Sequence, residues 1–169
     1  MLIFLKLGGS LITDKTQEGI FLVERMKHLA AQVQAARVAR PDLKLLIGHG
    51  SGSFGHFAAQ RHHTTAGVRT AEQWRGFAEV ARVARRLNHL VTDVLAEAGL
   101  PVWPIQPSAS AACEDGELRQ LAASPLQRAL EKGLVPLVYG DVALDTVRGG
   151  TIISTASQFI FLAPIPRQQ

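Results

Sequence analysis

The sequence predicts an α/β fold, a three-layer αβα sandwich in which a mostly parallel sheet lies between helices. Short apolar segments alternate with longer segments of helical periodicity, and this order is typical of parallel sheets covered on both faces. Three of the expected strands end in glycine-containing turns, as strands often do at the ligand-binding edge of such a sheet. A length of 169 residues, 47% hydrophobic and 19% charged, suits one domain with a substantial core.

Four short apolar runs bounded by turn residues are expected to form the strands of this sheet. They cover residues 2–7, 43–47, 101–105 and 134–139, and residues 152–153 add a shorter strand. Helical spacing of apolar residues predicts helices over residues 21–37, 70–97, 124–132 and 157–163. Thr70 is expected to cap the long helix and Gly99 to end it, while Pro125 suits a first helical turn. Residues 1–163 therefore form the predicted domain, and residues 164–169 an irregular tail.

Composition argues against several classes of protein. The net charge of +4 is spread along the chain, and the densest group, Arg82, Arg85 and Arg86, has helical spacing without interleaved aromatics. This pattern favours a solvated helix face over a nucleic-acid interface. No apolar run reaches the ~18 residues that a membrane-spanning helix needs. The single cysteine, Cys113, lies in an expected polar loop, cannot form an internal disulfide, and favours a reducing cytoplasm.

Three turns at strand ends could together bind a phosphate. They are Gly8-Gly9-Ser10, the segment from Gly48 to Gly55, and Gly140-Asp141. Glycines at such positions let backbone N–H groups approach an anion, and the N-terminus of a following helix adds partial positive charge. Any one of these turns could use glycine only for its backbone freedom, but three at one sheet edge favour phosphate binding.

Familiar catalytic templates do not fit. No Gly-Lys-Ser/Thr tripeptide of a Walker A motif is present, and neither Ser51 nor Ser53 satisfies the G-x-S-x-G pattern of serine hydrolases. The segment Gly50–Gly55 has the letters of a Rossmann G-x-G-x-x-G motif, but it follows a second strand and no helix is expected to begin at its last glycine. A serine hydrolase is therefore disfavoured.

Four charged or titratable residues are candidates for the chemistry. Lys6 ends an apolar strand, where a buried ammonium needs an anionic partner, although an edge lysine could also extend to solvent. Lys15 lies in a polar loop that suits a surface lysine equally well. His56 could point toward the same anion or be structural, and Asp141 could orient the lysines or cap a turn. Adjacent His62 and His63 diverge and have no third ligand, so no metal site is expected.

Five segments taken in order resemble isopentenyl phosphate kinases of the amino acid kinase superfamily. They are KLGGSLITDK at residues 6–15, HGSGSFGH at 49–56, QPS at 106–108, YGDV at 139–142 and GGTIIS at 149–154. The similarity extends to about Ala163, and the histidine that closes Gly-Ser-Phe-Gly-His suits an acceptor that presents a phosphate. The resemblance implies transfer of the γ-phosphoryl group of ATP, with Mg²⁺, to isopentenyl phosphate in isoprenoid biosynthesis.

The resemblance also implies roles for individual residues. Lys6 would stabilise charge on the transferred group, Lys15 would approach from its loop, and Asp141 would position the lysines. The residues expected at the ATP phosphates are Lys6, Gly8, Gly9, Ser10 and Gly52, and those at the acceptor are Gly50, Ser51, Gly52, His56 and Gly140. The prenyl chain needs an apolar slot, and Trp74, Phe77 and Val80 either supply it or belong to the core.

Members of the family are longer, and their second half supplies the nucleotide pocket. The chain is therefore expected to carry the N-terminal, acceptor-binding portion and to lack much of the nucleotide side. Ala156 replaces an acidic residue often found after the Ile-Ile-Ser segment. The resemblance implies a homodimer. Two alternatives stay open: a non-catalytic phosphate-binding remnant, and another amino acid kinase with a carboxylate or carbamate acceptor.

Overall fold

The computed structural model describes residues 1–163, and its main sheet is entirely parallel. The strand order is β1-β2-β6-β3, with β1 at Leu2–Leu7, β2 at Lys44–His49, β6 at Val135–Tyr139 and β3 at Val102–Pro104. These are the four predicted strands, shifted by at most two residues at an end. The predicted α/β fold class is confirmed. Because the strands are parallel, their carboxyl ends lie along one edge of the sheet.

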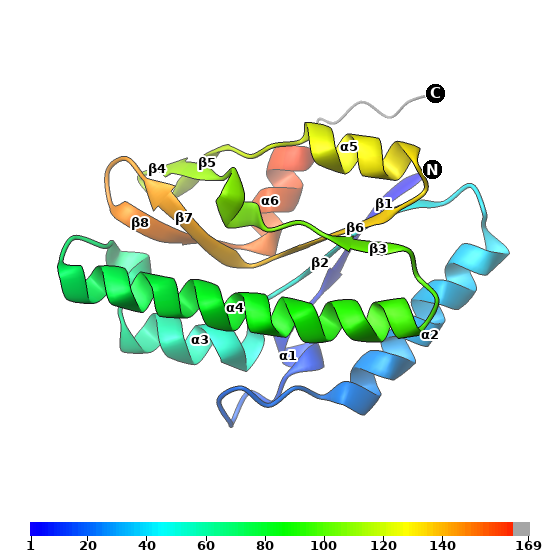
Figure 1. The fold of residues 1–169 in the computed structure, drawn as a ribbon, viewed down its shortest axis with the longest axis horizontal. Coiled ribbons are helices and arrows are strands. Elements are labelled where there is room, and N and C mark those ends of the chain that lie inside the picture. The colour runs from blue at the N-terminus through cyan, green and yellow to red at the C-terminus, as the bar shows by residue number, and fades with distance from the viewer. Residues whose placement is uncertain (164–169) are drawn as a thin grey trace.

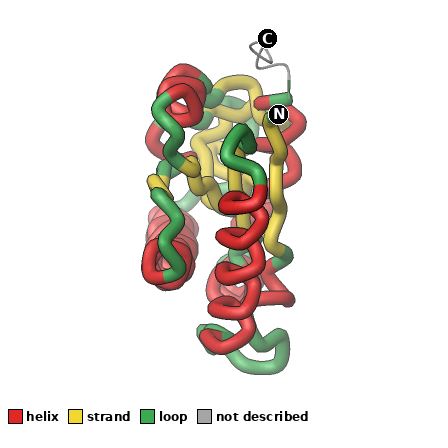
Figure 2. Tube along the Cα trace, turned by 90° about the vertical axis from the view of Figure 1, so that its right-hand side faces the viewer, coloured by secondary structure: helices red, strands yellow, loops and turns green. Residues whose placement is uncertain are grey.

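Helices cover both faces of this sheet (Figure 1). One face carries α1 (Gly9–Ile12), α2 (Val23–Ala39), α3 (Gly52–Arg61) and α4 (Ala71–Glu97), and the other carries α5 (Ser124–Glu131) and α6 (Thr155–Leu162). Thr70 caps α4 as predicted, through a reciprocal capping box with Gln73. Figure 2, turned by 90°, shows the strands lying between helices on either side. None of the helices among residues 1–163 is long and apolar enough to cross a membrane.

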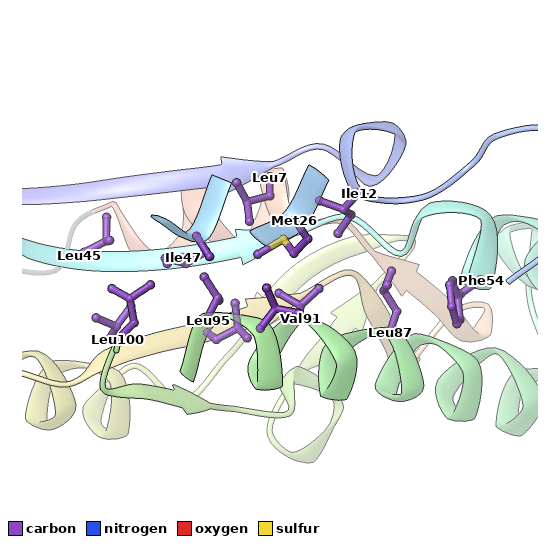
Figure 3. Close-up of a cluster of buried hydrophobic side chains, with 14 residues drawn as sticks. Leu7, Ile12, Met26, Leu45, Ile47, Phe54, Leu87, Val91, Leu95 and Leu100 are labelled. Carbon is purple, nitrogen blue, oxygen red and sulfur yellow. The ribbon is translucent and has the colours of Figure 1, made fainter. Parts of the chain in front are cut away.

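The largest core cluster lies between the sheet and α2 and α4. Figure 3 shows Leu87, Val91 and Leu95, which are spaced for one face of α4, packed toward strand residues such as Ile47. A second cluster on the opposite face joins the sheet to α5 and α6 through Leu126 and Leu162. Buried apolar side chains on both faces fix the strands, and the strands in turn fix the turns at their ends.

A second sheet of four strands was not predicted. Its order is β5-β4-β7-β8, with β5 at Glu117–Gln120, β4 at Ala112–Glu114, β7 at Asp141–Asp145 and β8 at Gly149–Ile153. Two of its three pairings are antiparallel, so the prediction of one mostly parallel sheet was incomplete. Only part of β8, residues 152–153, was predicted as a strand, and β5 is a polar segment without the apolar run that marked the strands of the main sheet. Cys113, expected in a loop, is a buried residue of β4.

Helix α3 begins inside the glycine-rich segment, although the sequence predicted no helix there. It starts at Gly52 and contains Gly55, two positions that disfavour helix on propensity alone. The helix forms because Phe54 and Ala58 are buried, with relative exposures of 3% and 0%. Tertiary packing therefore overrides local preference at this point. Short 3₁₀ helices occur at Thr64–Ala66 and Pro107–Ala109. The predicted tail, residues 164–169, lies outside the described residues.

Candidate functional site

A cavity of about 950 Å³ lies at the carboxyl ends of β1, β2 and β6. Nine of the predicted site residues line it: Lys6, Gly9, Ser10, Lys15, Gly50, Ser51, Gly52, His56 and Gly140. None of its lining residues among the described part of the chain is Asp or Glu. A hollow with two ammonium groups and no carboxylate on its walls suits an anionic ligand.

Two glycine-rich turns meet at this cavity with almost no space between them. A Cβ atom built on Gly9 would lie 2.6 Å from the backbone of Gly52, so a side chain at Gly9 would push the turns apart. Gly52 has a φ of +51°, a left-handed conformation that favours glycine. The turns therefore bring backbone from β1 and β2 together at one place, as expected for a surface that binds phosphate through N–H groups.

The hydroxyl of Thr13 joins the same two turns. It donates to the carbonyl of Gly9 at 2.8 Å and accepts from the backbone N–H of Ser53 at 2.9 Å. Thr13 is 1% exposed, so both hydrogen bonds are shielded from water. Thr13 also lines the cavity and was missed by the sequence interpretation, although it lies within the first matching segment. Its partners are four and forty positions away, and only the fold brings them together.

The N-terminus of α3 faces the cavity, with Ser51 at the N-cap position. The exposed partial positive charge of a helix N-terminus favours anions. The Ser53 hydroxyl is buried in this first turn and has no hydrogen-bond partner among residues 1–163. His56 follows one turn later, exposed and on the cavity wall. The N-terminus of α3 and the residues His56 and Ser53 thus all lie at the cavity.

Lys6 and Lys15 reach the cavity from different elements. Lys6 is the penultimate residue of β1, and Lys15 lies in the loop that follows α1. Both side chains are exposed, and within residues 1–163 neither forms an ion pair. Of the two alternatives for Lys6, a buried ammonium and an edge lysine that extends outward, the structure shows the exposed side chain, because the strand end opens into the hollow. Unpaired ammonium groups on a cavity wall are available to a ligand.

Within residues 1–163, no ion pair joins Asp141 to Lys6 or Lys15, the lysines that it was predicted to position. Its carboxylate accepts hydrogen bonds from the backbone N–H groups of Ser108, at 3.1 Å, and Val142, at 2.9 Å. Burial raises its pKa, and these hydrogen bonds oppose the rise. Asp141 does not line the cavity, because its carboxylate is turned toward the loop at Pro107–Ala109. Gly8 does not line the cavity either. The observed role of Asp141 is to hold that loop against β7.

A buried histidine holds the second glycine turn. The Nδ1–H of His49 donates to the carbonyl of Gly50 at 2.9 Å, and its Nε2 accepts from the Asn88 amide at 3.1 Å. The His49 carbonyl accepts from the Thr155 hydroxyl at 2.6 Å and from the N–H of Gly140 at 3.0 Å. Burial lowers the pKa of His49 to about 4, while the hydrogen bond to Gly50 opposes the fall. The imidazole is therefore neutral near pH 7 and ties β2 to α4, and the carbonyl of the same residue ties β2 to α6.

The apolar wall of the cavity differs from the one considered in the sequence. Phe57, Ala59, Ile152 and Ile153 line it, from α3 and β8. Trp74, Phe77 and Val80 do not line it: Val80 is buried in a core cluster against which Phe77 packs, and Trp74 makes an edge-to-face contact with Phe77. The core alternative is therefore observed for Val80 and Phe77, whereas Trp74 is exposed and lies neither in the core nor on the cavity wall. β8 was too short to be placed beside a cavity from sequence.

His62 and His63 diverge as expected. His63 lines the cavity, whereas Nε2 of His62 contacts a carboxylate oxygen of Glu79 on α4 at 2.8 Å. Within residues 1–163, no three His, Cys, Asp or Glu side chains are grouped so that they could hold a metal ion. Further wall residues missed from sequence are Thr65, Ser154 and Thr155. Ser154 caps α6, a signal visible as Ser-Thr before an apolar run.

The chain resembles several curated proteins named isopentenyl phosphate kinase. It is 36% identical over 152 residues to the one from Methanothermobacter thermautotrophicus, covering 87% of this chain and 56% of that protein. It is 34% identical over 163 residues to the one from Haloferax volcanii, covering 96% of this chain and 64% of that protein. The chain thus spans somewhat more than half the length of these curated relatives.

Solved structures of isopentenyl phosphate kinases are similar to this chain as well. A crystal structure described as isopentenyl phosphate kinase superposes with a TM-score of 0.88 at 33% identity, covering 96% of this chain and 67% of that one. A product complex of the Thermoplasma acidophilum isopentenyl phosphate kinase superposes with a TM-score of 0.82 at 27% identity, covering 98% and 65%. The Amino acid kinase family matches residues 1–163. The chain therefore belongs to the amino acid kinase family.

Proposed function

We propose that the protein transfers the γ-phosphoryl group of ATP to isopentenyl phosphate, giving isopentenyl diphosphate. The observation that carries this proposal is the cavity, in which two lysines, a histidine and two glycine turns meet and no carboxylate lines the wall. An acceptor carrying a phosphate and a short apolar chain matches a hollow with cationic and apolar walls. The names of the relatives support the same substrate.

Phosphoryl transfer asks the protein mainly for alignment and for stabilisation of negative charge. An oxygen of the acceptor phosphate forms a bond to the γ-phosphorus as the bond from that phosphorus to the β,γ-bridging oxygen breaks. Lys6 would stabilise the charge on the equatorial oxygens of the transferred group, and Lys15 would approach from its loop. Backbone N–H groups of the turns at Gly9 and Gly52 are preorganised by their close contact and would hold the ATP phosphates.

His56 would bind the acceptor phosphate. It lies one turn into α3, so it shares an anion with the partial positive charge of the helix N-terminus. Gly50, Ser51 and Gly140 would line the junction between the two substrates. Phe57 and Ile152 would contact the prenyl chain, because they form part of the apolar wall.

Mg²⁺ would come with the nucleotide. The described residues offer no cluster of carboxylates for it, and a cavity wall without Asp or Glu fits an ion held by phosphate oxygens. When bound there it would reduce the repulsion between two anionic reactants. In this proposal residues 1–163 are the acceptor-binding part of the domain and supply phosphate contacts. In this proposal residues 1–163 make no assigned contact with the adenosine of ATP. A cytoplasmic homodimer is part of the same proposal, and light scattering would test the dimer.

Phosphorus NMR of a mixture of the chain, ATP, Mg²⁺ and isopentenyl phosphate tests the proposal. We expect the diphosphate signals of isopentenyl diphosphate to grow only weakly, because no adenosine contacts are assigned to residues 1–163, and chelation of Mg²⁺ to stop them. Lys6→Ala should reduce the rate by at least about tenfold, since a charged hydrogen bond to the transition state is worth about 1.5–3 kcal/mol. Lys44→Ala is the matched control, because Lys44 is exposed at the opposite end of β2. Equal rates for both variants would contradict the proposal.

A further inference from the structure

We propose that Arg61 is a positioning residue that holds the loop of Lys15 over the cavity through an ion pair with Glu18. This inference rests on the function proposed above in one respect, because that function is what assigns a role to Lys15. The loop covers residues 14–20, between α1 and α2, and Arg61 is the last residue of α3. No sequence motif linked the two segments.

The base of the loop is fixed by backbone pairing. Thr13 and Phe21 form an antiparallel bridge. The N–H of Asp14 donates to the carbonyl of Ile20 at 3.0 Å, and the N–H of Leu22 donates to that of Ile12 at 2.9 Å. The loop is therefore a hairpin whose stem is rooted beside the glycine turns.

The tip of this hairpin has little of its own to hold it. The Oδ1 atom of Asp14 accepts from the N–H of Thr16 at 2.8 Å and from its hydroxyl at 2.7 Å, which turns the chain at Lys15. The four residues from Lys15 to Glu18 are exposed, so no buried apolar side chain anchors them. A contact outside the hairpin is needed to keep Lys15 at the cavity wall.

Glu18 provides that contact. The Nη2 atom of Arg61 lies 2.9 Å from Oε1 and 2.7 Å from Oε2 of Glu18. The Nη1 atom of Arg61 donates to Oε1 of Glu79 on α4 at 2.9 Å. One guanidinium thus joins the loop, α3 and α4, in a geometry that lysine cannot reproduce.

Arg61 is held in place from the α4 side. The neighbouring His62 contacts the other oxygen of Glu79 at 2.8 Å, and its ring lies against Gly76, where a Cβ atom would collide with it. Both carboxylate oxygens of Glu79 are therefore engaged, and the pKa of Glu79 is lowered, first by the hydrogen bond from His62. The guanidinium projects toward Glu18 from a fixed support rather than from a free surface side chain.

The same helix carries His56, five positions before Arg61. A rigid helix therefore sets the position of His56 directly and that of Lys15 through Glu18. In the proposed reaction these two side chains act on one pair of anions, so their separation affects the alignment of the substrates. The pair is about half exposed, at 48% for Arg61 and 43% for Glu18, and salt should screen it.

Trypsin cleavage after Lys15 tests the inference without reference to catalysis, because a protease needs the loop to detach locally. We expect Arg61→Gln and Glu18→Gln each to speed this cleavage by about twofold to fivefold at low salt, the range for an exposed ion pair. Arg61→Lys should restore only part of the protection, since lysine keeps the positive charge but lacks the planar guanidinium that contacts both Glu18 and Glu79. Arg119→Gln is the matched control, because Arg119 also bridges two exposed glutamates, on the β4–β5 hairpin.

Calorimetric binding of isopentenyl phosphate gives the functional readout. The dissociation constant should rise about twofold to fivefold in Arg61→Gln and Glu18→Gln at low salt, and the difference from wild type should shrink at high salt. Cleavage after Lys15 at the wild-type rate in both variants would overturn the inference. If Lys15→Ala binds isopentenyl phosphate as wild type does, the assigned use of Lys15 fails instead, and the protease result alone decides whether Arg61 orders the loop.

Discussion

Replacing His49 with glutamine should remove a specific pH dependence of stability. His49 is buried beneath the second glycine turn and has its pKa lowered to about 4, chiefly by burial. In the unfolded chain a histidine has its ordinary pKa of about 6.5. The unfolded chain therefore binds a proton more tightly than the folded protein does. Glutamine can keep a donor toward Gly50 and an acceptor toward Asn88 but does not titrate in this range.

The size of the effect follows from the two pKa values. Each whole step in pKa is worth about 1.4 kcal/mol, so the fall to about 4 corresponds to about 3 kcal/mol. Above about pH 6.5 the residue is neutral in both states and contributes no slope. As the pH drops from about 6.5 to about 4, the free energy of unfolding should fall, and below that range the contribution levels off.

Urea denaturation across this pH range measures the effect. From about pH 7 to about pH 4, the wild-type protein should lose about 3 kcal/mol more stability than His49→Gln. His89→Gln is the control, because His89 lies beside Asn88 on α4 but its side chain is 80% exposed. That variant should follow the wild-type curve. If His49→Gln also follows the wild-type curve, the neutral buried imidazole is not what the structure indicates.

Three further substitutions have expected outcomes that urea denaturation can check. Thr13→Val should lower the free energy of unfolding by about 1–3 kcal/mol, because the partners on Gly9 and Ser53 lose their hydrogen bonds. Thr13→Ser should keep most of the wild-type stability. Equal losses in the two variants would contradict this account. Asp145→Ala should cost about 3 kcal/mol near pH 7, since its carboxylate accepts from four backbone N–H groups. Hydrogen bonds that outweigh desolvation lower the pKa of Asp145, so this stability should be lost as the pH falls through the folded value; a pH-independent difference would contradict it. Gly52→Ala should cost about 1–2 kcal/mol because its φ is +51°, and no cost would show that the turn relaxes.

The parallel sheet could be predicted because each of its strands is an apolar run that must be covered on both faces. The second sheet could not, since β5 is the polar segment Glu117–Gln120 and β7 gains its place by pairing with β4 and β8. Helix α3 was hidden for a related reason. Its glycines and serines disfavour helix, and the compensation comes from Phe54 and Ala58 packing in the core.

Much of the candidate site could be predicted, because the carboxyl ends of parallel strands converge. Lys6 was placed at this edge on that ground, the family resemblance added Lys15 and His56, and all three line one cavity. The orientation of Asp141 could not be predicted, since its partner Ser108 is 33 positions away and reaches it through a loop that covers β7. The pair of Arg61 and Glu18 was invisible for the same reason, being 43 positions apart. Sequence indicates which strand ends meet, and long-range contacts decide where each side chain points.

The most direct test of the central claim is a calorimetric titration of isopentenyl phosphate and of isopentenol into the chain and into His56→Ala. If the cavity binds the acceptor through its phosphate, isopentenyl phosphate should bind the wild-type chain and isopentenol should not. His56→Ala should bind isopentenyl phosphate at least about tenfold more weakly, the loss of a charge-assisted hydrogen bond. Equal binding of the alcohol and the phosphate, or an unchanged affinity in His56→Ala, would contradict the account.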